Sequence, residues 1–243
     1  VDVQRMEAAV ERRREQTRSF FDSLSDGDEL RHRSLDGPYH RKVALSILPE
    51  TCKTILDLGT GSGLLLPALL ERADQVIAVD SSTTMLDLAR QTAGAEAHRC
   101  DFRLGDLEHL PVADGEVDAV VAGMVLHHVS TPSHALSEAW RALSEGGEVA
   151  IIDLAQHEDE SLREELADLW LGFQPTEMRR WLKASGFEVT HTGTVAPEPP
   201  ESGSNDDSQR MQLITFRGRK PWAKSRPPRA RAKAKAKAKA RSG

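Results

Sequence analysis

The stretch "ILDLGTGSG", residues 55–63, is an apolar run that contains Asp57 and is followed by glycine at every second position from Gly59. An apolar run that ends in a glycine-rich segment is typical of a buried strand that turns into a helix. Glycine has no Cβ atom, so a ligand can lie against the backbone of such a turn, and the start of the next helix points at it. The stretch therefore predicts a ligand site at the end of a strand in an α/β sheet.

Segments of strand length alternate with segments of helical periodicity on both sides of this turn. Strands are expected at 54–58, 75–80, 99–104, 117–126 and 148–154, with helices at 64–73, 82–93 and 132–143, the last closed by Gly146 and Gly147. Further helices are expected at 3–22, from Pro38 to near Pro49, and at about 158–170 and 176–185. This alternation predicts a parallel sheet with helices on both faces.

The last two expected strands, 186–195 and 210–220, have no helix between them and predict an antiparallel pair at one sheet edge. The predicted fold class is α/β, with a seven-stranded, mostly parallel sheet, an antiparallel terminal hairpin and helices on both faces. We expect a helical cover or linker over 1–50, a ligand-binding domain over 51–220 and a basic disordered tail over 221–243.

Charge is distributed unevenly along the 243 residues. The formal net charge is −6, yet 13 of the 32 Lys and Arg lie from Arg210 onward, where no Asp or Glu occurs. Alternating Ala and Lys cannot bury an apolar face, so we expect a solvated tail. Weak nonspecific contact of this tail with nucleic acid is an alternative, because each Lys–phosphate contact releases counterions. Contact with other polyanions is also open.

The cysteine content and the hydropathy pattern limit which classes of protein the chain can belong to. Only Cys52 and Cys100 occur, which predicts no disulfide framework and no metal site. No apolar run approaches the ~18 residues that span a bilayer, so no membrane partner is expected. There is also no basic-then-apolar leader, and we expect a cytoplasmic location.

Acidic residues at the ends of successive strands narrow the ligand class. Asp80 ends the second expected strand, where it can accept both ribose hydroxyls, and Asp106 follows the third, where it can accept an adenine amino proton. A dinucleotide turn has the spacing G-x-G-x-x-G, whereas this one has G-x-G-x-G. No Lys follows it, as a nucleoside triphosphate loop requires. Asp57 would repel a pyrophosphate but suits an ammonium group, so a sulfonium-bearing nucleoside is favoured.

Four stretches in this order resemble the class I S-adenosylmethionine-dependent methyltransferases, over roughly residues 38–217. They are "ILDLGTGSG", "VIAVDSSTTMLDLAR", "GDLEHLPVADGEVDAVVAGMVLHHV" and "HALSEAWRALSEGGEVAIIDL". The resemblance implies S-adenosylmethionine as the cofactor. It also implies a small-molecule methyl acceptor of the kind that the type 11 group uses.

Individual cofactor contacts follow from the same resemblance. It implies that the turn lines the methionine end, that Asp80 holds the ribose, and that the segment after the third strand holds the adenine. Arg33 and Tyr39 lie in a segment that often covers the cofactor and are candidates to contact its carboxylate. The other cofactor candidates are Asp57, Gly59, Thr60, Gly61, Gly63, Ser81, Met85, Gly105, Asp106, Leu107 and Met124.

A narrower resemblance links the chain to the methyltransferase half of ArsR-type regulators. The segments that carry it are "ERRREQTRSFFDSL" and "IDLAQHEDESLREELADLWLGFQPTEMRRWLKASGFE". In those proteins a winged-helix DNA-binding domain precedes the methyltransferase, and we expect this chain to be a fragment or a free-standing relative. Those relatives commonly carry His and Arg where residues 166–170 read "LADLW".

His127 and His128, after the fourth expected strand, are the catalytic candidates. A histidine at this place can orient or deprotonate a hydroxyl, thiol or carbon acid, although local packing explains it equally well. The predicted function is methyl transfer from S-adenosylmethionine to a small molecule. The alternative is a module that senses the cofactor or its product S-adenosylhomocysteine and controls an ArsR-type DNA-binding domain, with a homodimer through the 3–22 helix.

Overall fold

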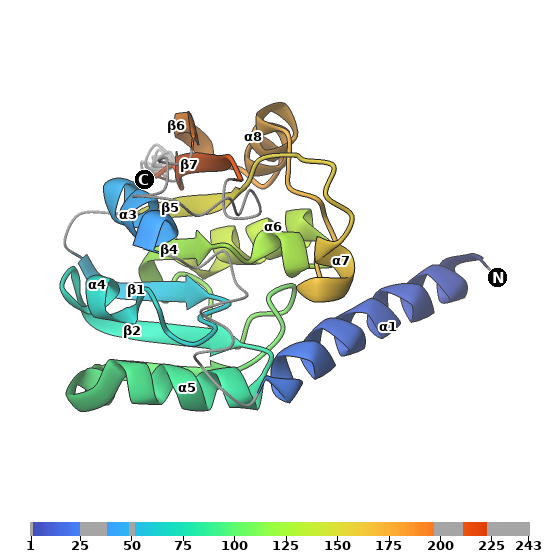
Figure 1. The fold of residues 1–243 in the computed structure, drawn as a ribbon. Coiled ribbons are helices and arrows are strands. Elements are labelled where there is room, and N and C mark those ends of the chain that lie inside the picture. Colours follow the sequence, from blue (N-terminus) through green and yellow to red (C-terminus); the bar gives the residue numbers. More distant parts are fainter. Residues whose placement is uncertain (1, 25–37, 49–51, 197–210, 223–243) are drawn as a thin grey trace, which may run out of the picture.

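A computed structural model describes residues 2–24, 38–48, 52–196 and 211–222, which form an α/β unit built on one sheet (Figure 1). Its seven strands have the order β3-β2-β1-β4-β5-β7-β6, which confirms the predicted fold class. The strands are β1 (Cys52–Leu58), β2 (Ala73–Asp80), β3 (Cys100–Leu104), β4 (Val117–Gly123), β5 (Leu143–Leu154), β6 (Glu188–Val195) and β7 (Leu213–Arg219).

The described helices pack on both faces of this sheet (Figure 1). They are α1 (Asp2–Ser23), α3 (Pro38–Ile47), α4 (Leu66–Leu70), α5 (Thr83–Ala93), α6 (Pro132–Ala142), α7 (Leu162–Glu165) and α8 (Pro175–Ala184), with 3-10 turns η1 (Gly94–Arg99) and η2 (Leu126–His128). Side chains alternate across each strand, so Leu56 packs in a core with α6 and α8, whereas Ile55 packs in a core with α3 and α4. Both cores are continuous and buried, which fixes the strand register.

The two strands of the terminal hairpin do not follow β5 in chain order. β7 lies between β5 and β6 and is antiparallel to both. Consequently only β7 runs against the other strands, and β6 forms the edge.

Three expected helices were too long. The one at 64–73 is reduced to Leu66–Leu70, since Pro67 fits only in a first turn and β2 already begins at Ala73. The helix at 132–143 ends at Ala142, and Gly146 and Gly147 lie inside β5 instead of closing it. Only Leu162–Glu165 is helical within 158–170, because Ala167 has a φ of +59° that ends helical geometry.

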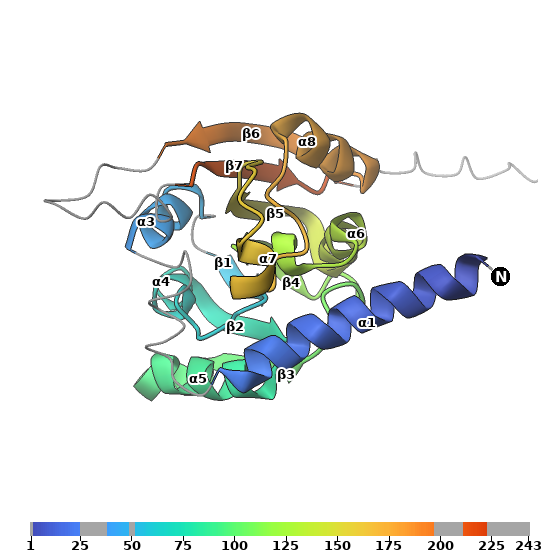
Figure 2. The same ribbon diagram turned by 45° about the vertical axis from the view of Figure 1, so that its right-hand side comes forward.

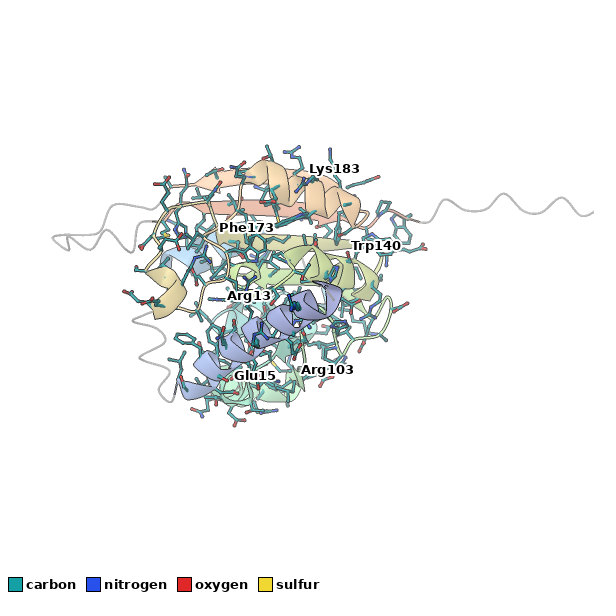
Figure 3. The ribbon with its side chains drawn as sticks, turned by 90° about the vertical axis from the view of Figure 1, so that its right-hand side faces the viewer. Arg13, Glu15, Arg103, Trp140, Phe173 and Lys183 are labelled. Atoms are coloured by element: carbon teal, nitrogen blue, oxygen red, sulfur yellow. The ribbon has the colours of Figure 1, made fainter. Side chains whose placement is uncertain are left out.

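Helix α1 crosses the side of the molecule toward which β1 and β2 point. Figure 3 looks at that side and shows α1 in front of the sheet, with Arg13 and Glu15 on it. Thr17 on the helix and Leu24 just after it are buried, and Asp22 accepts a 2.6 Å hydrogen bond from the hydroxyl of Ser82. Figures 1 and 2 show the N-terminal half of α1 extending beyond the body. None of the described helices is long and apolar enough to cross a membrane.

The turn after β1 offers a test of its packing. Gly63 has a φ of +82°, and a Cβ there would lie 2.9 Å from the Cα of Ala89 in α5. Gly61 has a φ of +52°, but its Cβ would meet no atom within 4 Å. We expect Gly61→Ala to lower the free energy of unfolding by ~1–2 kcal/mol through backbone strain alone.

Gly63→Ala adds a backbone clash and should cost about 1–3 kcal/mol more. Urea denaturation of the two variants measures this difference. Equal losses would show that the turn does not pack against α5 as described.

Candidate functional site

A cavity of about 300 Å³ lies where the strands β1, β2 and β4 end, under α1. The predicted site residues that the structure fully describes line this cavity, with the exception of Gly63. Gly63 instead faces α5 behind the turn. Arg33 lies outside the described residues, and so does the side chain of Tyr39. The predicted residues that line the cavity are Asp57, Gly59, Thr60, Gly61, Asp80, Ser81, Met85, Gly105, Asp106, Leu107, Met124, His127 and His128.

Asp57 lies at the floor of the turn and is 2% exposed. Its Oδ2 atom accepts a 2.8 Å hydrogen bond from the hydroxyl of Thr60. Burial raises the pKa of Asp57 to about 7; the Thr60 hydrogen bond opposes this shift, and the nearby Asp80 carboxylate adds to it. The carboxyl group is thus poised to change charge near neutral pH.

Asp80 ends β2 and holds two loops together. Its Oδ2 accepts from the backbone N–H of Gly61 and its Oδ1 from that of Ser82, both at 2.9 Å. Burial raises the pKa of Asp80, while these amide hydrogen bonds oppose the shift. Each carboxylate oxygen has two lone pairs. The backbone N–H of Ser81 is a further donor to this carboxylate, and its remaining acceptor capacity is available to a hydroxyl group in the cavity.

Asp106 and Glu108 connect the segment after β3 to helix α1. Arg14 donates to Glu108 Oε2 at 2.6 Å, and its Nε lies 3.5 Å from Asp106 Oδ2. The Glu108 carboxylate is 1% exposed and also accepts from the backbone N–H of Thr131 at 2.9 Å. Arg14 therefore fixes α1 over the cavity through a nearly buried ion pair.

His127 follows β4, which lies on the other side of β1 from β2 and Asp80. Its Nδ1 is 2.6 Å from Asp153 Oδ1, and the Asp153 carboxylate also accepts from the backbone N–H groups of Leu126 and Leu154. The Asp153 carboxylate accepts hydrogen bonds and has none to donate. In this contact His127 is therefore the donor, through its Nδ1–H. The other ring nitrogen, Nε2, lies 3.8 Å from Oδ1 of Asp168.

His128 and Asp168 lie beside His127. Burial and the neighbouring His127 lower the pKa of His128 well below its usual value, and the ring of Phe21 meets it edge-on at 5.0 Å. Asp168 is 3% exposed, and neither of its carboxylate oxygens has a hydrogen-bond partner. Burial raises the pKa of Asp168 to about 6.

Sequence reasoning did not identify Arg14, Glu108, Asp153 or Asp168. Asp153 had a usable signal, because it lies near the end of a predicted strand, as Asp57 and Asp80 do. Arg14 and Asp168 had none, since their partners are distant in sequence. The segment "LADLW" was noted only for lacking histidine and arginine, although it supplies Asp168.

The sheet order with its antiparallel last strand, and a ligand cavity over the β1 turn, define the fold of the class I S-adenosylmethionine-dependent methyltransferases. Residues 56–151 match the family model described as a methyltransferase domain.

Curated relatives and a solved structure agree with this class. A demethylmenaquinone methyltransferase of Deinococcus radiodurans is 34% identical over 55% of this chain and 58% of its own. An arsenite methyltransferase of Halobacterium salinarum is 38% identical over 43% of this chain and 28% of its own. The chain thus spans little more than half of the first relative and less than a third of the second. A methyltransferase of Haloferax volcanii, in complex with the activator Trm112, has a TM-score of 0.69 at 24% identity, over 83% of this chain and 97% of its own.

The Arg14–Glu108 pair can be tested through the position of α1. Arg14→Ala leaves the Glu108 carboxylate buried without its cation, and we expect a loss of about 1–3 kcal/mol in the free energy that holds α1 in place. Hydrogen exchange of the α1 amides measures this loss. Arg12→Ala, which removes an exposed arginine from the same helix, is the matched control. Equal exchange in the two variants would contradict the docking role of Arg14.

Proposed function

We propose that this protein transfers the methyl group of S-adenosylmethionine to a small-molecule acceptor. The observation that carries the proposal is one cavity that is lined by the glycine turn, by Asp80 at the end of β2, and by His127 and His128 after β4. Its volume lies within the range of about 300–1,000 Å³ common for small-ligand sites. A cavity that has carboxylates on one side of the β1 turn and histidines on the other suits a cofactor and an acceptor placed side by side.

We place the cofactor along the turn and the ends of β2 and β3. Asp57 would attract the ammonium group, Asp80 would accept from the ribose hydroxyls, and Asp106 would accept from the adenine amino group. The backbone of Gly61 offers an open surface to the cofactor, because a Cβ atom built there would meet no other atom within 4 Å. Ser81, Met85, Gly105, Leu107 and Met124 line the same side and would contact the nucleoside and the amino-acid chain.

The acceptor would lie against His127 and His128. Methyl transfer forms a bond from the acceptor atom to the methyl carbon as the carbon–sulfur bond breaks, so alignment supplies much of the acceleration. The acceptor proton must leave if the acceptor is a hydroxyl or thiol. His127, oriented by Asp153, is the polar group placed to take or direct that proton.

The cysteines argue against arsenite as the acceptor. Cys52 and Cys100 are the first residues of β1 and β3, so they lie at the opposite end of the sheet from the cavity. Burial raises the pKa of the Cys52 thiol to about 11, which disfavours the reactive thiolate. The two are unpaired, in keeping with our proposal of a cytoplasmic protein.

Helix α1 supports a second candidate, a module that senses the cofactor or S-adenosylhomocysteine and acts on an attached ArsR-type DNA-binding domain. The inner half of α1 lines the cavity through Arg14, Thr17 and Phe21, while its outer half extends beyond the body (Figure 2). A bound ligand would therefore bias the position of a projecting helix, through which a homodimer would form. Clearly tighter binding of S-adenosylhomocysteine than of S-adenosylmethionine would favour this candidate.

The domain assignment follows from the same arrangement. We propose that residues 1–50 cover the cavity, that 51–220 hold the cofactor, and that the basic tail over 221–243 is separate from both. Weak contact of that tail with nucleic acid stays a proposal, since it lies outside the described residues except for Pro221 and Trp222.

The role of Asp80 can be measured directly. Asp80→Ala removes the acceptor for both ribose hydroxyls, and we expect about 2–4 kcal/mol of cofactor affinity to be lost. Titration calorimetry with S-adenosylmethionine measures it. The control is Asp87→Ala, which removes a carboxylate that is 70% exposed and paired with Arg90 on α5. Affinity within twofold of wild type for Asp80→Ala would exclude this cofactor placement.

The pKa of Asp57 predicts a pH dependence of cofactor binding. The carboxyl group is neutral below a pKa of about 7, and only its ionised form attracts the cofactor's ammonium group. We expect affinity to fall as the pH drops from 7 to 5.5, approaching tenfold per unit. Asp57→Asn should remove this slope, and calorimetry across the range compares the two proteins. Parallel slopes would show that Asp57 does not face the ammonium group.

A further inference from the structure

Thr17 on α1 carries a buried hydroxyl group that none of the cofactor placements above uses. The residue is 9% exposed and lines the cavity. Among the described residues, its Oγ1 atom has no hydrogen-bond partner. A threonine inside a helix commonly bonds the carbonyl oxygen one turn earlier, and Thr17 does not. A buried hydroxyl group without a partner destabilises the folded chain, so a ligand atom that pairs with it would be favoured in the cavity.

The position of Thr17 on the helix directs its side chain toward the body of the protein. Arg14, Thr17 and Phe21 are spaced by three and four residues, which places them on one face of α1. All three line the cavity. The residues directly before and after Thr17, Gln16 and Arg18, are exposed. Thr17 therefore belongs to the inner face of the helix.

Contacts on both sides of Thr17 hold this part of the helix over the cavity. Three residues before it, Arg14 Nε lies 3.5 Å from Asp106 Oδ2. Five residues after it, Asp22 accepts a 2.6 Å hydrogen bond from the hydroxyl of Ser82. At a rise of 1.5 Å per residue, Thr17 is about 4.5 Å along the helix from Arg14 and about 7.5 Å from Asp22. Thr17 thus lies between the two anchors and closer to the one that involves Asp106.

The chemistry of adenine explains what such a hydroxyl could bind. The adenine amino group donates hydrogen bonds, and the ring nitrogens on either side of it, N1 and N7, accept them. A carboxylate such as that of Asp106 pairs with the amino group and cannot pair with a ring nitrogen, which needs a donor. The Thr17 hydroxyl is a donor on the helix face that reaches Asp106 through Arg14.

We propose that Thr17 recognises the adenine ring of the cofactor, its hydroxyl donating to the ring nitrogen N1 or N7 beside the amino group that pairs with Asp106. This inference rests on the proposed function, because it takes the adenine to lie beside Asp106. Since Thr17 is part of α1, the contact makes the docking of the helix depend on the nucleobase. Thr17 is then a specificity residue for the cofactor that lies outside the sheet and its loops.

The test compares the affinity of full-length variants for S-adenosylhomocysteine by titration calorimetry. Thr17→Val replaces the hydroxyl with a methyl group and keeps the branched side chain, and we expect it to bind about 3–10-fold more weakly than wild type. Thr17→Ser keeps the hydroxyl and should bind within twofold of wild type. Ser19→Ala, which removes an exposed hydroxyl from the same helix, should bind like wild type. Unchanged affinity of Thr17→Val would overturn the proposal.

Cofactor analogues identify the ring nitrogen. The 1-deaza and 7-deaza forms of S-adenosylhomocysteine each replace one of the two nitrogens with a C–H group. Wild type should bind one of them about 3–10-fold more weakly than the parent compound. Thr17→Val should show a smaller loss for that analogue, because the contact is already missing. Equal losses in the two proteins, or no loss in wild type for either analogue, would overturn the proposal.

Thermal unfolding and hydrogen exchange separate a binding role from a structural one. Without ligand, Thr17→Val should unfold at or above the wild-type temperature, because a buried hydroxyl without a partner is gone. S-adenosylhomocysteine should protect the α1 amides more in wild type and Thr17→Ser than in Thr17→Val. A lower unfolding temperature of ligand-free Thr17→Val would show a structural role and overturn the proposal. Absence of cofactor binding by wild type contradicts the proposed function itself, whereas wild-type affinity in Thr17→Val contradicts only the role of Thr17.

Discussion

The carboxylate of Asp80 is the constraint on which the cavity depends. It accepts from the backbone N–H of Gly61 in the turn after β1 and from that of Ser82 at the start of α5. Because β1 and β2 are parallel neighbours, their ends are already close, and these two hydrogen bonds set the loops relative to each other. The same carboxylate thereby builds the site and keeps lone pairs for a ligand.

The rest of the site depends on helix α1, which lies outside the sheet. Arg14 reaches the nearly buried Glu108, and Asp22 accepts from Ser82, so two points along the helix are attached to loops beside the cavity. Phe21 meets His128 between these points. Under the proposed function, a ligand in this cavity would contact the groups that hold α1, whether the protein acts as an enzyme or as a sensor.

The sequence predicted the strands and the strand-end residues that short-range patterns determine. The strands around the turn followed from the apolar runs, and Asp57, Asp80 and Asp106 each lie at or next to the end of a predicted strand. Asp168 was not predictable, because its place beside His127 depends on backbone hydrogen bonds from Leu169 and Trp170 to a residue about forty positions earlier. Arg14 and Glu108 are 94 positions apart, and no local pattern links them. The lengths of the helices near 64–73 and 158–170 were wrong because one proline and one residue with positive φ decide them.

Isothermal titration of the purified chain with S-adenosylmethionine, and then with S-adenosylhomocysteine, tests the central claim most directly. We expect both to bind at one site per chain with micromolar dissociation constants. Such a result would place a sulfonium nucleoside in the cavity formed by the glycine turn and Asp80. Absence of binding by either ligand, in a chain shown to be folded, would contradict the account of the cavity as a cofactor site.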